Sequence, residues 1–145
     1  MAEAVALRVR ANELLEGEGP GVILLGDLND VPRAATTQLL SGPPGSEPAT
    51  PGFDAPDKGD DARLFNLAPL IAQKRRFSRV FRRIPELIDH IAVSEELVPG
   101  KPRRLPVVDS HIDALGPLPS IGTNPGRRRD KPGSDHAPVT AAFEL

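Results

Sequence analysis

The sequence predicts a mixed α/β (α+β) fold, with a mixed, largely antiparallel sheet and flanking helices. Two observations lead to this prediction. Apolar residues recur at helical spacing from Ala4 to Leu15, and segments typical of strands follow at 22–25, 77–82 and 86–94. The chain has 145 residues, a length that fits one domain.

The first three elements follow from this pattern. The N-terminal helix covers Ala4 to Leu15 and stops at the glycine-rich stretch that begins with Gly17. The continuous apolar run at 22–25 is bounded by glycines, which predicts a short strand buried on both faces. Pro32 then opens a second short helix that runs to Leu40.

The middle of the chain changes character twice. Residues 42–61 are rich in Gly, Pro and acidic residues, so we expect a flexible surface loop or a partly disordered segment. A helix is predicted at 62–73, split by Pro69. Alternation then predicts a strand at 77–82, a turn at Ile84 and Pro85, and a partner strand at 86–94. The remaining predicted elements are a closing turn at 95–98, a strand at 104–108, a loop at 109–134 and a final strand at 137–145.

The composition excludes several kinds of site. There is no Cys, which excludes disulfides, thiolate metal sites and cysteine nucleophiles. There is no Tyr or Trp, which disfavours binding of single-stranded nucleic acid by aromatic stacking. No apolar run approaches the length of a membrane span, and the first 25 residues lack a signal-peptide pattern. We therefore expect no membrane span and, by default, a cytoplasmic location.

The net charge of −2 hides two opposite halves. Residues 1–73 hold 5 basic and 11 acidic side chains, a net charge of −6, whereas residues 74–145 hold 13 and 9, a net charge of +4. The basic half is mostly arginine, and six basic residues lie within 74–83. Because the planar guanidinium suits phosphate, this segment is either a track for a phosphorylated substrate or a solvated strand face with charged edge protection.

Polar residues follow the first predicted strand in the sequence Gly26-Asp27-Leu28-Asn29. Ligand sites in α/β sheets form at such strand ends. If the chain stays extended, Asp27 and Asn29 project to the same side and offer a carboxylate and a neutral amide to one ligand. Turn and cap residues at a strand end are the alternative interpretation.

An acid lies inside the apolar segment Leu87-Ile88-Asp89-His90-Ile91. A buried carboxylate needs a donor such as a histidine or an arginine. Alternation sends Asp89 and His90 to opposite faces of the strand, so they are not expected to be each other's partner. We expect His90 to be a packing residue with one satisfied nitrogen.

The segment Gly133-Ser134-Asp135-His136-Ala137 places an acid and a histidine just before the last predicted strand. Asp135 suits Mg²⁺, which prefers one or two carboxylates and water. His136 is suited to donate to a phosphate oxygen or to exchange a proton, and Asp89 would orient it. An Asp cap beside a surface histidine is the alternative.

In this order, G-D-L-N, E-L-I-D-H-I-A-V-S and G-S-D-H-A-P-V resemble motifs in the second half of the endonuclease/exonuclease/phosphatase superfamily. The resemblance implies metal-dependent hydrolysis of a phosphoester. It implies that Asp27 orients or deprotonates the attacking water, that Asn29 contacts the phosphate and that Asp135 serves a Mg²⁺ or Mn²⁺ site. His136 would stabilise the phosphorane, with Asp89 orienting it.

Members of this superfamily are longer and fold as four-layer αββα sandwiches. Because the resemblance covers their second half, we expect residues 1–145 to be the C-terminal half of such a domain, without the Glu that is the principal metal ligand. The expected partners are nucleic acid or another phosphodiester, with self-association or a complementing N-terminal half. The alternative function is a non-catalytic remnant or subunit that binds a phosphorylated ligand or a partner chain. DNA, RNA, lipid and inositol phosphates all remain open as substrates.

Overall fold

The computed structural model describes residues 1–17, 19, 21–42, 45, 47–53, 55, 62–98, 107–109 and 134–143. Its helices are α1 (Ala2–Leu15) and α2 (Ala35–Ser41), with short 3-10 helices at Ala68–Leu70, Gln73–Arg75 and Glu95–Leu97. Its strands are β1 (Ile23–Asp27), β2 (Phe65–Asn66), β3 (Arg79–Phe81), β4 (Ile84–Glu86), β5 (Asp89–Val93), β6 (Val107–Asp109) and β7 (Thr140–Ala142). This mixture of helices and antiparallel strands confirms the predicted α+β class.

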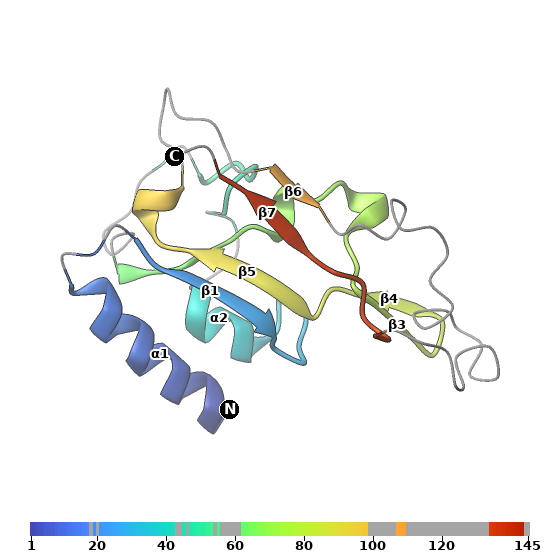
Figure 1. Ribbon diagram of the computed structural model, residues 1–145, viewed down its shortest axis with the longest axis horizontal. Coiled ribbons are helices and arrows are strands. Elements are labelled where there is room, and N and C mark those ends of the chain that lie inside the picture. The colour runs from blue at the N-terminus through green and yellow to red at the C-terminus, as the bar shows by residue number, and fades with distance from the viewer. Residues whose placement is uncertain are drawn as a thin grey trace.

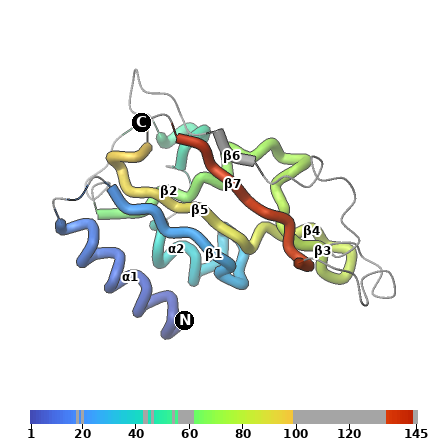
Figure 2. Tube along the Cα trace, in the orientation of Figure 1, coloured from blue at the N-terminus to red at the C-terminus, as the bar shows by residue number. Residues whose placement is uncertain are grey.

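Strand β5 is the centre of the principal sheet, which has the order β1-β5-β2 and is antiparallel throughout (Figure 2). Two further antiparallel pairs, β3-β4 and β6-β7, complete the described strands. Among the described helices, none is long and apolar enough to cross a membrane.

Different elements cover the two faces of the principal sheet. Helix α1 packs on one face through Ala11, which forms a buried cluster with Leu64 and Ala92. Strand β7 crosses the other face in front of β5, whereas α2 lies behind the sheet (Figure 1). The larger buried core lies under β7 and consists of Phe65, Leu67, Ala68, Ile71, Leu87, Ile91, Val93 and Val98.

The prediction that the first strand is buried on both faces is wrong. The side chains of β1 alternate between exposed and partly buried, with Ile23 47% and Leu25 70% exposed. Their cross-strand neighbours on β5, Val93 and Ile91, are buried because β7 covers them. Within the described part of the chain, the apolar face of β1 beside β7 is therefore open.

The predicted helix at 62–73 is also wrong. Residues Phe65 and Asn66 pair with β5 as a strand, and a 3-10 helix with a proline in its first turn follows. Leu67 and Ile71 are completely or almost completely buried, so packing against β5 overrides the local helical pattern. The guanidinium of Arg76 donates to the carbonyls of Pro69 and Ile71 and fixes this irregular path.

The predicted hairpin exists, but its turn and its partner strand differ from the prediction. The turn lies at Arg82 and Arg83, since Phe81 pairs with Ile84, and Pro85 lies within β4. Both turn arginines have positive φ, 48° and 71°. A two-residue loop of this kind is a type I′ turn, which favours Asn-Gly because left-handed φ costs other residues about 1–2 kcal/mol each. Strand β5 is a separate element that pairs with β1 and β2.

Smaller differences concern the loops. The second helix begins at Ala35, because residues 31–34 form a turn closed by a hydrogen bond from the amide of Ala34 to the carbonyl of Val31. Part of the predicted flexible loop at 42–61 is packed: Pro48 is buried, and Phe53 makes an edge-to-face contact with Phe65 at 6.4 Å. Of the predicted strand at 104–108, residues 107 and 108 are described, and they belong to β6. Most of the predicted loop at 109–134 lies outside the described residues.

Candidate active site

The register between β1 and β5 brings two carboxylates together. Asp27 is the last residue of β1 and pairs directly with Asp89, the first residue of β5. Both side chains project to the face that carries Leu25 and Ile91. Gly26, immediately before Asp27, has a φ of +151°, a conformation that residues with a side chain rarely adopt.

His136, from the segment that leads into β7, completes this cluster. Its Nδ1 lies 2.9 Å from Oδ2 of Asp89 and 3.9 Å from Oδ2 of Asp27. One ligand atom from each of the three side chains lies within 4.8 Å of the others. Three segments that are far apart in the sequence therefore meet at one point of the sheet face.

The charges of this cluster need a positive partner. Two carboxylates directly opposite each other on neighbouring strands repel. Oδ2 of Asp89 is buried and has no hydrogen bond of regular geometry among the described residues, so its close polar contact is the His136 ring. Two carboxylates and an imidazole at these distances also fit a divalent cation, for which oxygen and nitrogen are suitable ligands. The residues present are thus compatible with the metal that the motifs imply.

Asp135 and Asn29 lie outside this three-residue cluster. Asp135 is largely exposed, with its Oδ1 4.0 Å from Nε2 of His136. The chain does not stay extended beyond Asp27: Asn29 has a φ of +53°, and its backbone amide donates to Oδ1 of Asp27 at 2.8 Å. The expected shared projection of Asp27 and Asn29 is therefore wrong. Instead, both line a cavity of about 400 Å³ between the 27–30 loop, α1 and α2.

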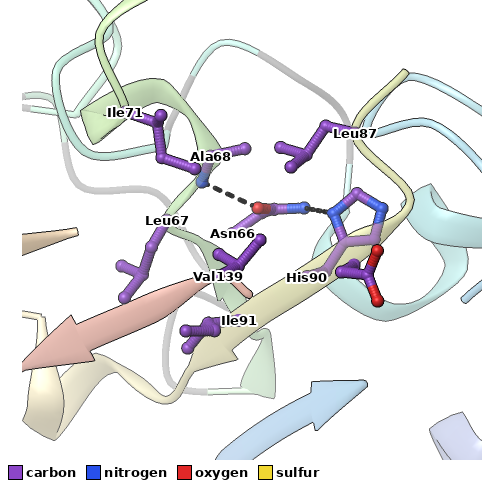
Figure 3. A pocket seen from close by; sticks show the side chains of 9 residues that line it. Asn66, Leu67, Ala68, Ile71, Leu87, His90, Ile91 and Val139 are labelled. Atoms are coloured by element: carbon purple, nitrogen blue, oxygen red, sulfur yellow. Dashed lines mark hydrogen bonds between the residues drawn. The ribbon is translucent and has the colours of Figure 1, made fainter. Parts of the chain in front are cut away.

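His90 is a buried packing residue on the opposite face of β5, and both of its ring nitrogens have partners. Nε2 donates to the carbonyl of Asp30 at 2.7 Å, so Nδ1 is the acceptor for the amide of Asn66 at 3.2 Å. The Asn66 side-chain oxygen in turn accepts from the amide of Ala68 (Figure 3). This chain of hydrogen bonds holds the loop that follows Asp27.

Burial lowers the pKa of His90 below its ordinary value of 6.5. The hydrogen bond to the Asp30 carbonyl and the charges of Asp89, Asp27 and Asp30 act in the opposite direction but do not reverse the effect. His90 is thus held neutral, in the tautomer that carries its proton on Nε2.

Ser78 supports the site through hydrogen bonds to the backbone, a role that the sequence did not predict. Its buried hydroxyl oxygen accepts from the amides of Ile88 and Asp89 at 3.2 and 3.3 Å, and its carbonyl accepts from the amide of Ala137 at 2.7 Å. One residue therefore fixes the backbone next to both Asp89 and His136. A single serine in a basic, alternating segment carries no pattern that would have revealed this.

A family model described as "Endonuclease/Exonuclease/phosphatase family" matches residues 1–136. The chain belongs to this family. The family hydrolyses phosphoesters and generally uses divalent metal ions, in agreement with the carboxylate and imidazole cluster. No curated protein and no solved structure matches the chain.

Replacing Ser78 tests its supporting role. In Ser78→Ala the buried amides of Ile88 and Asp89 lose their acceptor, so we expect a loss of about 1–3 kcal/mol in the free energy of unfolding. Urea denaturation measures this loss, and amide NMR signals of Asp89 and Ala137 should move. The matched control is Ser94→Ala, another fully buried serine, whose hydroxyl accepts from the amide of Val22. An Asp89 amide signal that stays in place in Ser78→Ala would contradict the assignment.

The lowered pKa of His90 predicts a pH dependence of stability. Because the unfolded chain binds a proton more readily than the folded one, the contribution of neutral His90 is complete above about pH 6.5 and is lost as the pH falls below it. The difference in unfolding free energy between wild type and His90→Gln should therefore shrink from pH 7.5 to pH 5.5. Urea denaturation at both pH values measures it. A difference that grows on acidification would show that His90 is charged in the folded state.

Proposed function

We propose that this chain hydrolyses phosphodiester bonds of nucleic acid, with Mg²⁺ or Mn²⁺ as cofactor. The observation that carries the proposal is the contact between Asp89 and Nδ1 of His136 at 2.9 Å, beside Asp27 on the open face of the sheet. An orienting acid, an imidazole and a second carboxylate are the groups that general acid–base chemistry at phosphorus requires.

His136 and Asp89 act as a pair in this proposal. With Nδ1 held by Asp89, the ring has a fixed orientation, and Nε2, which lies 4.0 Å from Oδ1 of Asp135, would be the nitrogen left for a substrate. When the ring carries a proton on both nitrogens, Nδ1 would stay on Asp89 and Nε2 would donate to a phosphoryl oxygen on which negative charge develops during attack. Asp89 is the positioning residue, and His136 is the residue that contacts the substrate.

Asp27 and Asn29 act on the other side of the reacting phosphate. The Asp27 carboxylate is partly exposed. Its Oδ1 accepts from the backbone amide of Asn29, and its Oδ2 lies 3.9 Å from Nδ1 of His136. That second oxygen is available to orient a water molecule or to accept its proton. Asn29, which lines the neighbouring cavity, would contribute its neutral side-chain amide to the phosphate.

We assign the carboxylate of Asp135 to the divalent cation, directly or through water, next to the cluster of Asp27, Asp89 and His136. A bound divalent ion would supply charge neutralisation at the phosphoryl oxygens and a lower pKa for its bound water. Asp135 is exposed and adjacent to His136, which suits a ligand that meets an ion together with the substrate.

The exposed apolar face of β1 favours a second candidate function. Ile23 and Leu25 lie on the same strand as Asp27, and an exposed apolar patch beside a polar site marks a contact with another molecule. In this candidate the chain binds a phosphorylated ligand without cleaving it, as a subunit that self-associates or packs against a complementing N-terminal half.

Cleavage of supercoiled plasmid DNA and of a bis-phosphodiester in Mg²⁺ tests the first candidate. We expect wild type to cleave and His136→Ala and Asp89→Asn to be slower by about 10²-fold or more, the contribution typical of a positioned acid or base. EDTA should abolish cleavage. Glu13→Gln, on the exposed side of α1, is the matched control and should retain the wild-type rate.

Cleavage that survives in His136→Ala would contradict the assigned roles. If wild type binds the bis-phosphodiester but does not cleave it, the binding subunit becomes the better description.

A further inference from the structure

The arginines of the basic segment 74–83 differ in their surroundings: some make contacts within the protein, and others are exposed at the tip of the β3-β4 hairpin. Arg76 is bound to backbone carbonyls, and Arg79 pairs with Glu86 across the β3-β4 hairpin at 3.0 Å. Arg82 and Arg83, at the turn, are exposed and have no carboxylate partner among the described residues. The hairpin therefore carries its uncompensated positive charge at its end.

The Phe81 ring contacts the guanidinium of one of these two arginines, Arg82. The guanidinium carbons of Arg79 and Arg82 each lie 5.2 Å from the centre of the Phe81 ring. Phe81 and its cross-strand neighbour Ile84 are both exposed. A guanidinium that stacks on a ring keeps its N–H groups directed outwards, so it needs less ordering to bind a phosphate in a bidentate way.

The turn conformation does not account for the two arginines. Both have the positive φ that a type I′ turn requires, and Asn-Gly is the pair that suits it. Arginine at both positions is unfavourable for the backbone, and its side chains make no internal ion pair there among the described residues. Local strain of this kind is found where the side chains serve a function.

We propose that the tip of the β3-β4 hairpin binds the phosphate backbone of a nucleic acid duplex and guides it to the Asp89–His136 pair; the inference rests on the proposed function. Two arginines on a projecting, open tip suit an extended polyanion with phosphates at regular spacing. The lack of Tyr and Trp disfavours a single strand. The large apolar side chains exposed at the tip are those of Phe81 and Ile84, and Phe81 is flanked by guanidinium groups, which disfavours insertion into a membrane.

The hairpin is attached to the active site at its base. Ser78, directly before β3, is hydrogen-bonded to the backbone of both Asp89 and Ala137. Figure 1 shows the hairpin at one end of the molecule, beside the segment that leads into β7. A duplex held at the tip is therefore held close to the segment that carries His136.

The experiment measures binding of a fluorescein-labelled 20-base-pair DNA duplex to the full chain by anisotropy in EDTA, where no metal-dependent cleavage occurs. In Arg82→Asn/Arg83→Gly we expect at least about a tenfold loss of affinity and a shallower salt dependence, because two phosphate contacts are lost. The same variant should have a higher Tm, because Asn-Gly suits the turn. A loss of affinity with a gain of stability excludes unfolding as the cause.

Arg83→Gln and Arg10→Gln form a matched pair of single variants. Each removes one exposed arginine, but Arg10 lies on α1 and pairs with Glu13, so only Arg83→Gln should weaken binding. Equal affinities of wild type and the double variant would overturn the proposal, as would binding to phosphatidylserine vesicles but not to the duplex. The binding assay contains EDTA and is therefore independent of cleavage. If the hairpin arginines are needed for duplex binding but wild type does not cleave DNA in Mg²⁺, the hairpin proposal stands and the proposed function is refuted.

Discussion

The antiparallel register between β1 and β5 is the constraint on which the site depends. It places Asp27 opposite Asp89 on one face of the sheet, so two carboxylates share a small volume. Such a pair is unfavourable by itself. His136, which β7 brings across the same face, supplies the compensating contact. A slip of the register by one residue would send His90 to this face and Asp89 into the interface with the helices, and the cluster would be lost.

Two buried residues hold this geometry. The neutral His90, on the helix side of β5, connects Asn66 on β2 to the carbonyl of Asp30 and so holds the loop that carries Asn29. Ser78 holds the backbone at Asp89, where β5 begins, and at Ala137, next to His136. The face of β1 that carries Leu25 stays open for a substrate or a partner.

The sequence was informative where local pattern and tertiary structure agree. Local pattern predicted that the N-terminal helix, a strand before Asp27 and a strand around Asp89 exist. It did not predict that one face of the first strand is exposed, or that the Asp89 strand pairs with β1 and β2. The segment 62–73 was not predictable, since its apolar residues fit a helix locally but pack against β5 as a strand and an irregular turn. Asn29 was misplaced because a single positive φ ends the extended chain. Ser78 was missed because its role arises from contacts with residues 10, 11 and 59 positions away.

The central claim is that Asp89 fixes the His136 ring through Nδ1, leaving Nε2 for the substrate. The ¹⁵N chemical shifts of the imidazole nitrogens test it most directly, because they report which nitrogen carries the proton of the neutral ring. We predict that neutral His136 carries its proton on Nδ1 in wild type and that Asp89→Asn removes this preference. A ring that carries its proton on Nε2 in wild type, unchanged in Asp89→Asn, would contradict the account.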